Sequence, residues 1–157
     1  NGDDRLLRHL QAARAVLVGG AALAPEVHLQ ASTAQINVIT SYGSSETAGG
    51  CVYNGTPLDG VDISLTPEKK IAIKGSILAT TYLGAQTLWD TNIQDGWLIT
   101  SDSGRIENEK LIVEGRLDDV IISGGENISL SAIEGSLHAH FPHKSFAAFT
   151  DIIAICC

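Results

Sequence analysis

The sequence predicts an α/β fold with three consecutive parts: a parallel α/β portion, a small antiparallel β-barrel portion, and a mixed α+β segment at the C-terminal end. Residues 15–40 follow the order strand, Gly-Gly loop, helix, strand, which is typical of a βαβ unit. Residues 61–73 alternate apolar and polar side chains between turn residues, as short antiparallel strands do. Residues 114–134 (EGRLDDVIISGGENISLSAIE) place a charged, glycine-rich connector beside a strand-like run and a helical pattern.

Composition limits the classes of partner. The 157 residues are 44% hydrophobic, which is enough for a buried core, and the net charge of -8 argues against a nucleic-acid groove or an anionic membrane as the main partner. An acidic protein can still bind a nucleotide through backbone N–H groups and Mg²⁺. The three cysteines have neither disulfide nor metal spacing, so we expect a reducing cytoplasm. No run of about 18 apolar residues is present, and no membrane helix or signal peptide is predicted.

The α/β portion is expected to cover about residues 1–54. Its apolar spacing and its helix-start signals, among them Pro25, give the element order. The carboxyl ends of parallel strands usually carry the binding loops, which here would be residues 19–23 (GGAAL) and 41–50 (SYGSSETAGG). The expected elements are a helix over 4–14, a strand over 15–18, a helix from Pro25 to about Ser32, and a strand over 36–40.

The barrel portion is expected over about residues 55–104, and strands and a helix should follow it. Asn108-Glu109 reads as the turn of a hairpin, and Ser129 or Ser131 as the start of a helix, with Glu134 completing a capping box from Ser131. The expected strands are 61–65, 71–73, 97–100, 105–107, 110–113, 120–122, 145–150 and 152–157.

The loop over residues 41–50 combines an aromatic ring, hydroxyl groups and a single carboxylate. Tyr42 is suited to stacking on a flat base, and Glu46 is a hard oxygen ligand suited to Mg²⁺. The alternative interpretation is a polar turn in which Glu46 is solvated.

Further charged groups follow two later strands. Asp102 has two acceptor oxygens suited to the paired hydroxyls of a ribose, and Arg116 offers a fork of donors to a phosphate or ribose oxygen. The alternative is ordinary surface charge, including an Asp–Arg pair. Asp118-Asp119 is either a hinge or a solvated acidic turn. Gly124-Gly125 either lets a ligand approach the backbone or forms a simple turn.

Taken together, these motifs resemble those of the adenylate-forming superfamily of acyl-CoA synthetases, adenylation domains and luciferases. The chain carries GGAAL, YGSSE, ITSD, GRLDD and GGENI in the family's order and at similar spacing, and GRLDDVIISGGENIS is the most specific of these motifs. Within the superfamily, the segment AGGCVYNG (48–55) looks most like that of o-succinylbenzoate–CoA ligases, and its small residues leave room for an acid that bears a ring.

The resemblance implies domains and site residues. Residues 1–117 would be the C-terminal part of the large AMP-binding domain, and 118–157 a partial small domain after a hinge at Asp118. The adenine and acyl pocket would be lined by Gly20, Ala21 and Ala22. The other implied roles are adenine stacking by Tyr42 above an open floor at Gly43, phosphate contact by Ser45, Mg²⁺ coordination by Glu46, ribose binding by Asp102, nucleotide contact by Arg116, and approach of the CoA arm to Gly124 and Gly125.

The implied activity is that of an AMP-forming acid–CoA ligase that uses ATP, Mg²⁺, CoA and a small carboxylic acid, with o-succinylbenzoate of menaquinone synthesis as the expected acid. The alternatives are another aryl or fatty acyl-CoA ligase, a carrier-protein adenylation domain, or a nucleotide-binding fragment without turnover. A homodimer is compatible with this interpretation. The family's phosphate loop and C-terminal lysine have no counterpart in the sequence, and Ser101 stands where a Gly usually precedes the ribose-binding Asp. We therefore expect these 157 residues alone to be inactive.

Overall fold

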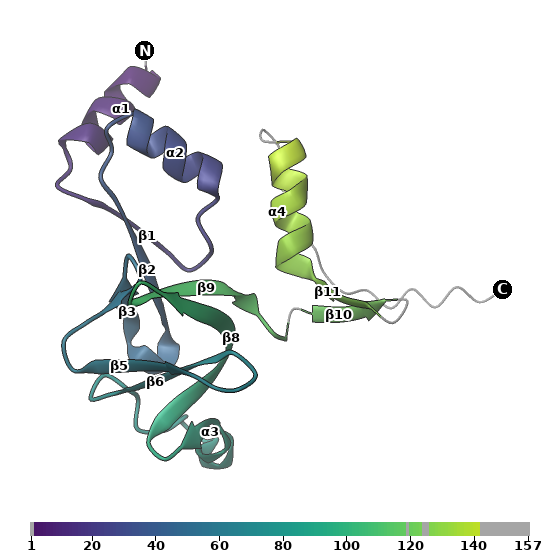
Figure 1. The fold of residues 1–157 in the computed structure, drawn as a ribbon. Coiled ribbons are helices and arrows are strands. Elements are labelled where there is room, and N and C mark those ends of the chain that lie inside the picture. The colour runs from purple at the N-terminus through teal and green to yellow at the C-terminus, as the bar shows by residue number, and fades with distance from the viewer. Residues whose placement is uncertain (1, 119, 124–125, 142–157) are drawn as a thin grey trace. The chain divides into compact units, whose positions relative to one another are not determined.

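The computed structural model describes residues 2–118, 120–123 and 126–141 (Figure 1). It divides into two compact units, Asn1–Glu114 and Gly115–Cys157. Its mixture of helices, a parallel strand pair and antiparallel sheets confirms the predicted fold class. The domain bounds at 117 and 118, which rest on the family resemblance, stay a prediction.

The first unit begins with the predicted βαβ arrangement. Strands β1 and β2 pair in parallel, with Val16 opposite Val38 and Gly19 opposite Ser41. Pro25 lies at the first turn of the intervening helix, where its missing N–H costs no hydrogen bond. The elements are α1 (Gly2–Ala12), β1 (Val16–Gly19), α2 (Pro25–Thr33) and β2 (Val38–Ser44).

The predicted ten-residue loop over 41–50 is wrong in its extent. Ser41–Ser44 continue β2, and the chain returns antiparallel to β2 as β3. The glycines that suggested a loop instead allow two backbones to approach closely in a hairpin. The elements of this part are β2, the 3-10 helix η1 (Ser45–Thr47), β3 (Gly49–Tyr53) and β4 (Thr56–Pro57), and they complete a sheet of order β1-β2-β3-β4.

A second sheet of five antiparallel strands follows, in the order β5-β6-β8-β7, with β9 also paired to β8. The predicted hairpin turn is confirmed: Asn108 and Glu109 both have positive φ, at 50° and 65°, as a tight two-residue turn requires. Asp102 lies inside a long strand rather than at a strand end, because pairing continues on both sides of it. The strands are β5 (Val61–Leu65), β6 (Lys70–Gly75), β7 (Ile93–Gln94), β8 (Trp97–Glu107) and β9 (Lys110–Arg116).

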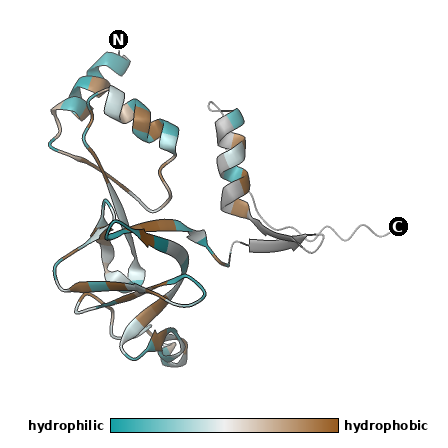
Figure 2. Ribbon diagram, in the orientation of Figure 1, coloured by the Kyte–Doolittle hydropathy of each residue, from teal (hydrophilic) through white to brown (hydrophobic). Residues whose placement is uncertain are grey.

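Helix α3 (Gln86–Asn92) was not predicted from the sequence. Its seven residues are too few for a clear helical period, and it is anchored by one buried side chain, Trp89. The core of the first unit lies between the two sheets, whereas Leu17 on β1 and Leu29 on α2 are exposed. Figure 2 colours the ribbon by hydropathy, with apolar residues in brown. The core residues are Cys51, Val52, Val61, Ile71, Ile73 and Leu111.

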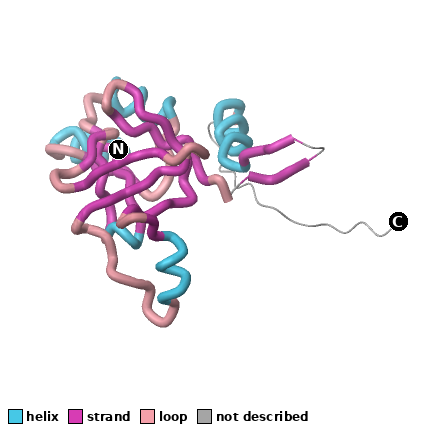
Figure 3. The backbone as a smooth tube through the Cα atoms, turned by 60° about the horizontal axis from the view of Figure 1, so that its bottom comes forward, coloured by secondary structure: helices cyan, strands magenta, loops and turns pink. Residues whose placement is uncertain are grey.

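The second unit contains a β-hairpin followed by a helix (Figure 3). Strands β10 (Val120–Ser123) and β11 (Glu126–Ser129) pair antiparallel, and α4 (Leu130–His140) follows directly. Strand β11 was not predicted. Because Ser131 lies inside α4, a capping box that starts at Ser131 is wrong, whereas Ser129 directly precedes the helix as predicted.

Two expected strands, 145–150 and 152–157, lie outside the described residues. Within the described ranges, none of the helices has both the length and the apolar character needed to cross a bilayer.

Candidate active site

The carboxyl ends of β1 and β2 lie side by side. Gly19 is opposite Ser41, and a Cβ built on Gly19 would lie 2.4 Å from Ser41 Oγ, so only glycine fits there without a shift. The predicted pocket loop, Gly20–Ala22, leaves β1 at this point, and Gly20 has a φ of 86° that favours glycine. Two predicted groups of site residues therefore emerge from adjacent parallel strands, the position where ligands of open α/β sheets usually bind.

Gly43 allows the hairpin to close. A Cβ on this residue would lie 1.9 Å from the carbonyl oxygen of Gly49, which is backbone and cannot rotate away. The strand pairing shifts register between Tyr42 and Gly43, so the hairpin contains a bulge next to the site. The family resemblance implies that Gly43 keeps a pocket floor open, whereas in the structure its lack of a side chain allows the close contact between the two strands.

Tyr42 and Asp102 are joined across 60 residues of sequence. The Tyr42 hydroxyl donates a hydrogen bond of 2.8 Å to Asp102 Oδ2, and the tyrosine ring packs against the core. Asp102 is held in turn by its backbone N–H, which donates to Thr100 Oγ1 at 3.1 Å. Burial, and secondly the bond to Asp102, raises the pKa of Tyr42 well above its usual range, so the phenol stays a donor. Sequence reasoning gave both residues nucleotide roles but did not predict this link.

Glu46 is held by a segment that the sequence analysis did not single out. Its Oε1 accepts a 2.6 Å hydrogen bond from the hydroxyl of Tyr82, and its backbone carbonyl accepts one of 2.8 Å from the Ala79 N–H. Glu46 is therefore not the solvated side chain of the alternative interpretation. No periodic pattern in residues 76–85 marks Tyr82, because its role depends on a contact across 36 residues.

Thr47 fixes the short turn that carries Glu46. Its side chain is buried, with Oγ1 accepting from the Ser44 N–H at 2.9 Å and donating to the Gly49 carbonyl at 2.7 Å. Ser45, the predicted phosphate contact, is exposed on the same turn. The buried Ser44 Oγ makes no hydrogen bond within the described part of the chain. The turn thus presents the Glu46 carboxylate next to the exposed Ser45, while Thr47 is buried beneath it.

Arg116 and Asp118 form an ion pair in the second unit. Arg116 Nε donates to Asp118 Oδ1 at 2.8 Å, and a second guanidinium nitrogen contacts Oδ2. Both side chains are about half exposed, at 52% and 51%. The alternative interpretation of Arg116, in which it forms an Asp–Arg pair, therefore agrees with the structure, and the aspartate of the pair is Asp118. Asp119, Gly124 and Gly125 lie outside the described residues.

The donors suit a magnesium ion that arrives with a nucleotide. Among the described residues, no group of three or more His, Cys, Asp or Glu side chains could hold a metal ion. Mg²⁺ is commonly bound by one or two carboxylates together with substrate phosphates, so a single Glu46 is sufficient for that mode. A shallow hollow of about 310 Å³ lies elsewhere, at the start of β2, and contains none of the predicted site residues.

Comparison with known proteins gives acid–CoA ligases, among them 2-succinylbenzoate–CoA ligases and long-chain-fatty-acid–CoA ligases. No family model matches the chain. A probable 2-succinylbenzoate–CoA ligase of Mycobacterium tuberculosis is 38% identical over 138 residues, which cover 86% of this chain and 36% of that protein. The chain thus spans about a third of the length of the curated relatives it matches.

Solved structures agree with these relatives. The o-succinylbenzoate CoA synthetase of Bacillus subtilis in complex with the acyl-adenylate intermediate has a TM-score of 0.75 at 27% identity, covering 87% of this chain and 34% of that one. The same enzyme in complex with ATP and magnesium ion has a TM-score of 0.74 at 27% identity, with the same coverage. By these likenesses the chain is similar, over most of its length, to o-succinylbenzoate–CoA ligases of the adenylate-forming superfamily.

Proposed function

We propose that this chain is part of an AMP-forming acid–CoA ligase that activates a carboxylic acid with ATP and transfers it to CoA. The observation that carries the proposal is the hydrogen bond from Tyr42, in the first sheet, to Asp102, in the second sheet. Tyr42 lies on the same hairpin that carries Glu46. The first unit thereby holds in fixed contacts the aromatic ring and the two carboxylates to which we assign the stacking, ribose and metal roles. The ATP and magnesium complex of the Bacillus subtilis relative supports this assignment.

In the first half-reaction, an oxygen of the acid's carboxylate attacks the α-phosphorus of ATP. The bond to pyrophosphate breaks, and an acyl-AMP forms. Glu46 would hold Mg²⁺, which supplies charge neutralisation on the phosphates. Tyr42 would stack on adenine, Ser45 would contact phosphate, and Asp102 would bind the ribose hydroxyls, while Gly20, Ala21 and Ala22 would line the pocket. These residues position the reactants rather than transfer protons.

In the second half-reaction, the CoA thiol attacks the acyl carbon and AMP leaves. We propose that Asp118 is the hinge of this step, with Arg116 contacting the nucleotide and Gly124 and Gly125 approaching the CoA arm. The Arg116–Asp118 pair gives the hinge a physical basis, because a half-exposed ion pair costs little to break and re-form. A lid-type turn of this kind can present a second set of groups to the same site.

The preferred acid is o-succinylbenzoate, which would place the enzyme in menaquinone synthesis. The support is the similarity to 2-succinylbenzoate–CoA ligases and the small residues Ala48, Gly49 and Gly50, of which Ala48 and Gly49 are exposed. Fatty or aryl acids are the competing substrates. A cytoplasmic location and a homodimer stay predictions from the sequence.

The decisive experiment measures pyrophosphate release by the full-length protein with ATP, Mg²⁺ and a panel of acids. We expect kcat/KM for o-succinylbenzoate to exceed the values for benzoate and a fatty acid by a factor of about a hundred. This factor corresponds to a free-energy difference of about 2.7 kcal/mol. Equal rates with all three acids would remove the substrate assignment only. No release with any acid, and no binding of an acyl-AMP mimic, would overturn the ligase assignment.

A further inference from the structure

The segment between β6 and α3 holds Glu46 at two points. The Tyr82 hydroxyl donates to Glu46 Oε1 at 2.6 Å, and the Ala79 N–H donates to the Glu46 carbonyl at 2.8 Å. One bond fixes the end of the glutamate side chain and the other fixes its backbone. A solvated surface glutamate needs neither of these hydrogen bonds, so the two bonds together indicate that this segment holds Glu46 in place.

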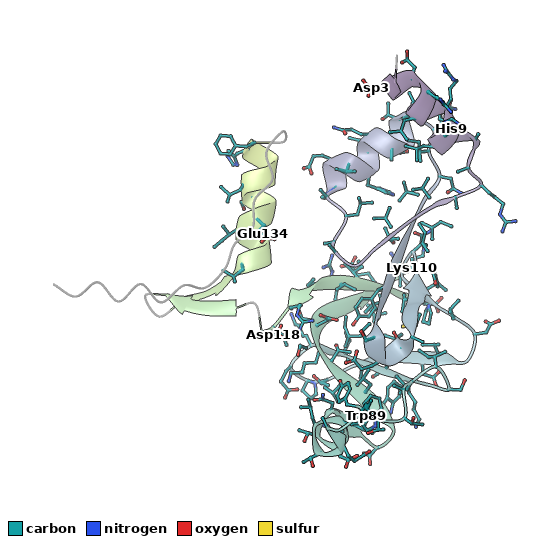
Figure 4. All side chains as sticks on the ribbon, turned by 180° about the vertical axis from the view of Figure 1, so that it is seen from behind. Asp3, His9, Trp89, Lys110, Asp118 and Glu134 are labelled. Atoms are coloured by element: carbon teal, nitrogen blue, oxygen red, sulfur yellow. The ribbon has the colours of Figure 1, made fainter. Side chains whose placement is uncertain are left out.

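The Tyr82 ring is itself held in place. It meets the indole of Trp89 edge to face, with ring centroids 5.2 Å apart and an interplanar angle of 86°. Trp89 is buried on α3, where Figure 4 labels it, and the Ala85 N–H bonds the Tyr82 carbonyl at 3.1 Å. An aromatic pair of this geometry is favourable beyond its buried area, so the hydroxyl is presented from a fixed platform.

The chemistry of the pair suits orientation of a charged ligand group. A hydrogen bond to an ionised carboxylate is shorter and stronger than a neutral one. A glutamate held in this way loses rotamer freedom before a ligand arrives, which lowers the entropic cost of binding.

We propose that Tyr82 is a positioning residue, which fixes the Glu46 carboxylate in the orientation that receives the Mg²⁺ of a bound nucleotide. This inference rests on the proposed function, in which Glu46 is the magnesium ligand. Trp89 supports it indirectly, by holding the Tyr82 ring. The inference thus gives α3 a role in metal-dependent binding, through the contact of Trp89 with the Tyr82 ring.

The test compares Tyr82→Phe with the unchanged full-length protein. Calorimetry measures the binding of a non-hydrolysable ATP analogue at a series of Mg²⁺ concentrations, at a temperature well below the Tm of each variant. Phenylalanine keeps the ring on Trp89 and removes only the donor. We expect the Mg²⁺ concentration for half-maximal binding to rise by a factor of about five to ten, with binding restored at high Mg²⁺.

Tyr53→Phe is the matched control, because the Tyr53 hydroxyl donates to the Gly50 carbonyl at 3.2 Å and does not contact Glu46. It should leave the Mg²⁺ dependence unchanged. Glu46→Gln separates the two proposals. If Glu46→Gln weakens Mg²⁺-dependent binding and Tyr82→Phe does not, the positioning role is wrong and the ligase proposal stands. If Glu46→Gln has no effect on the Mg²⁺ dependence, Glu46 is not the ligand and the inference fails with it.

Discussion

Two regions of the first unit contrast in how they use apolar residues. The hairpin and the five-stranded sheet supply the buried core, in which Cys51, Ile71 and Ile73 have no exposed surface. The α1–β1–α2 region has comparable apolar residues at helix and strand spacing, yet Leu17 is 60% exposed and Leu29 is 67% exposed.

The contrast teaches that a pattern predicts which side of an element is apolar, but not that the side is covered. In the five-stranded sheet, β6 pairs on one side with β5, its neighbour in sequence, and on the other side with β8. In the parallel pair, β1 has a single neighbour within the described residues, and parallel sheets normally need cover on both faces. Four predictions test the contrast.

The largest effect is expected at the closest backbone approach in the hairpin. Gly43→Val should destabilise the chain by about 3 kcal/mol or more, because the new side chain would collide with the Gly49 carbonyl. Urea unfolding followed by tryptophan fluorescence measures this. Gly84→Ala is the control, since open space surrounds that glycine and only its φ of 76° opposes a side chain, at about 1 kcal/mol. Equal losses at both positions would show that the hairpin contact is not close.

The next effect compares the two regions directly. Ile73→Ala should cost roughly 2–5 kcal/mol, because it leaves a cavity in the core. Leu29→Ala should change the free energy of unfolding by less than about 0.5 kcal/mol, since its side chain is already in water. Thermal and urea unfolding of the 157-residue chain give both values. A large loss for Leu29→Ala would mean that α2 is packed in solution, which contradicts the contrast.

A smaller effect is expected at the link between the sheets. Tyr42→Phe removes the hydrogen bond to Asp102 while keeping the ring, and should lower the free energy of unfolding by about 1–2 kcal/mol. The folded state raises the pKa of Tyr42, mainly by burial, so it binds more protons than the unfolded state at alkaline pH. The stability is therefore fully present below a pH of about 10, the usual tyrosine pKa, and is lost as the pH rises above that value.

Unfolding experiments between neutral pH and pH 11 test this dependence. The slope of stability against pH above about 10 should be smaller in Tyr42→Phe than in the unchanged chain. An identical slope in the two proteins would show that Tyr42 is not the group whose ionisation lowers the stability at alkaline pH.

The smallest effect is expected on the exposed face of β8 and β9. Arg105 pairs with Glu107 at 2.6 Å and with Glu114 at 2.9 Å, but its side chain is 47% exposed. Arg105→Gln should leave the Tm unchanged within error, because exposed pairs gain little over hydration. A clear drop in Tm that disappears at high salt would show that this network contributes to the sheet.

The sequence was a good guide to elements whose determinants are local. Pro25, the alternation at Val61, Ile63 and Leu65, and the turn at Asn108-Glu109 each act within a few residues, and the structure has the predicted helix, strand and turn. It failed at 41–50, where glycines serve a hairpin rather than a loop, and at Asp102, which lies inside β8. Local composition does not distinguish these cases, because the deciding contact is with another strand.

By itself, then, the sequence determined the order of the elements with clear local signals and the resemblance to the superfamily, since motif order and side-chain type are properties of the chain. The nucleotide-binding roles of the motif residues stay predictions. Only the tertiary structure decided how those residues are held. Tyr42 meets Asp102, and Glu46 meets Tyr82, across 60 and 36 residues of sequence. Such contacts depend on sheet pairing and packing between distant segments, which no local pattern encodes.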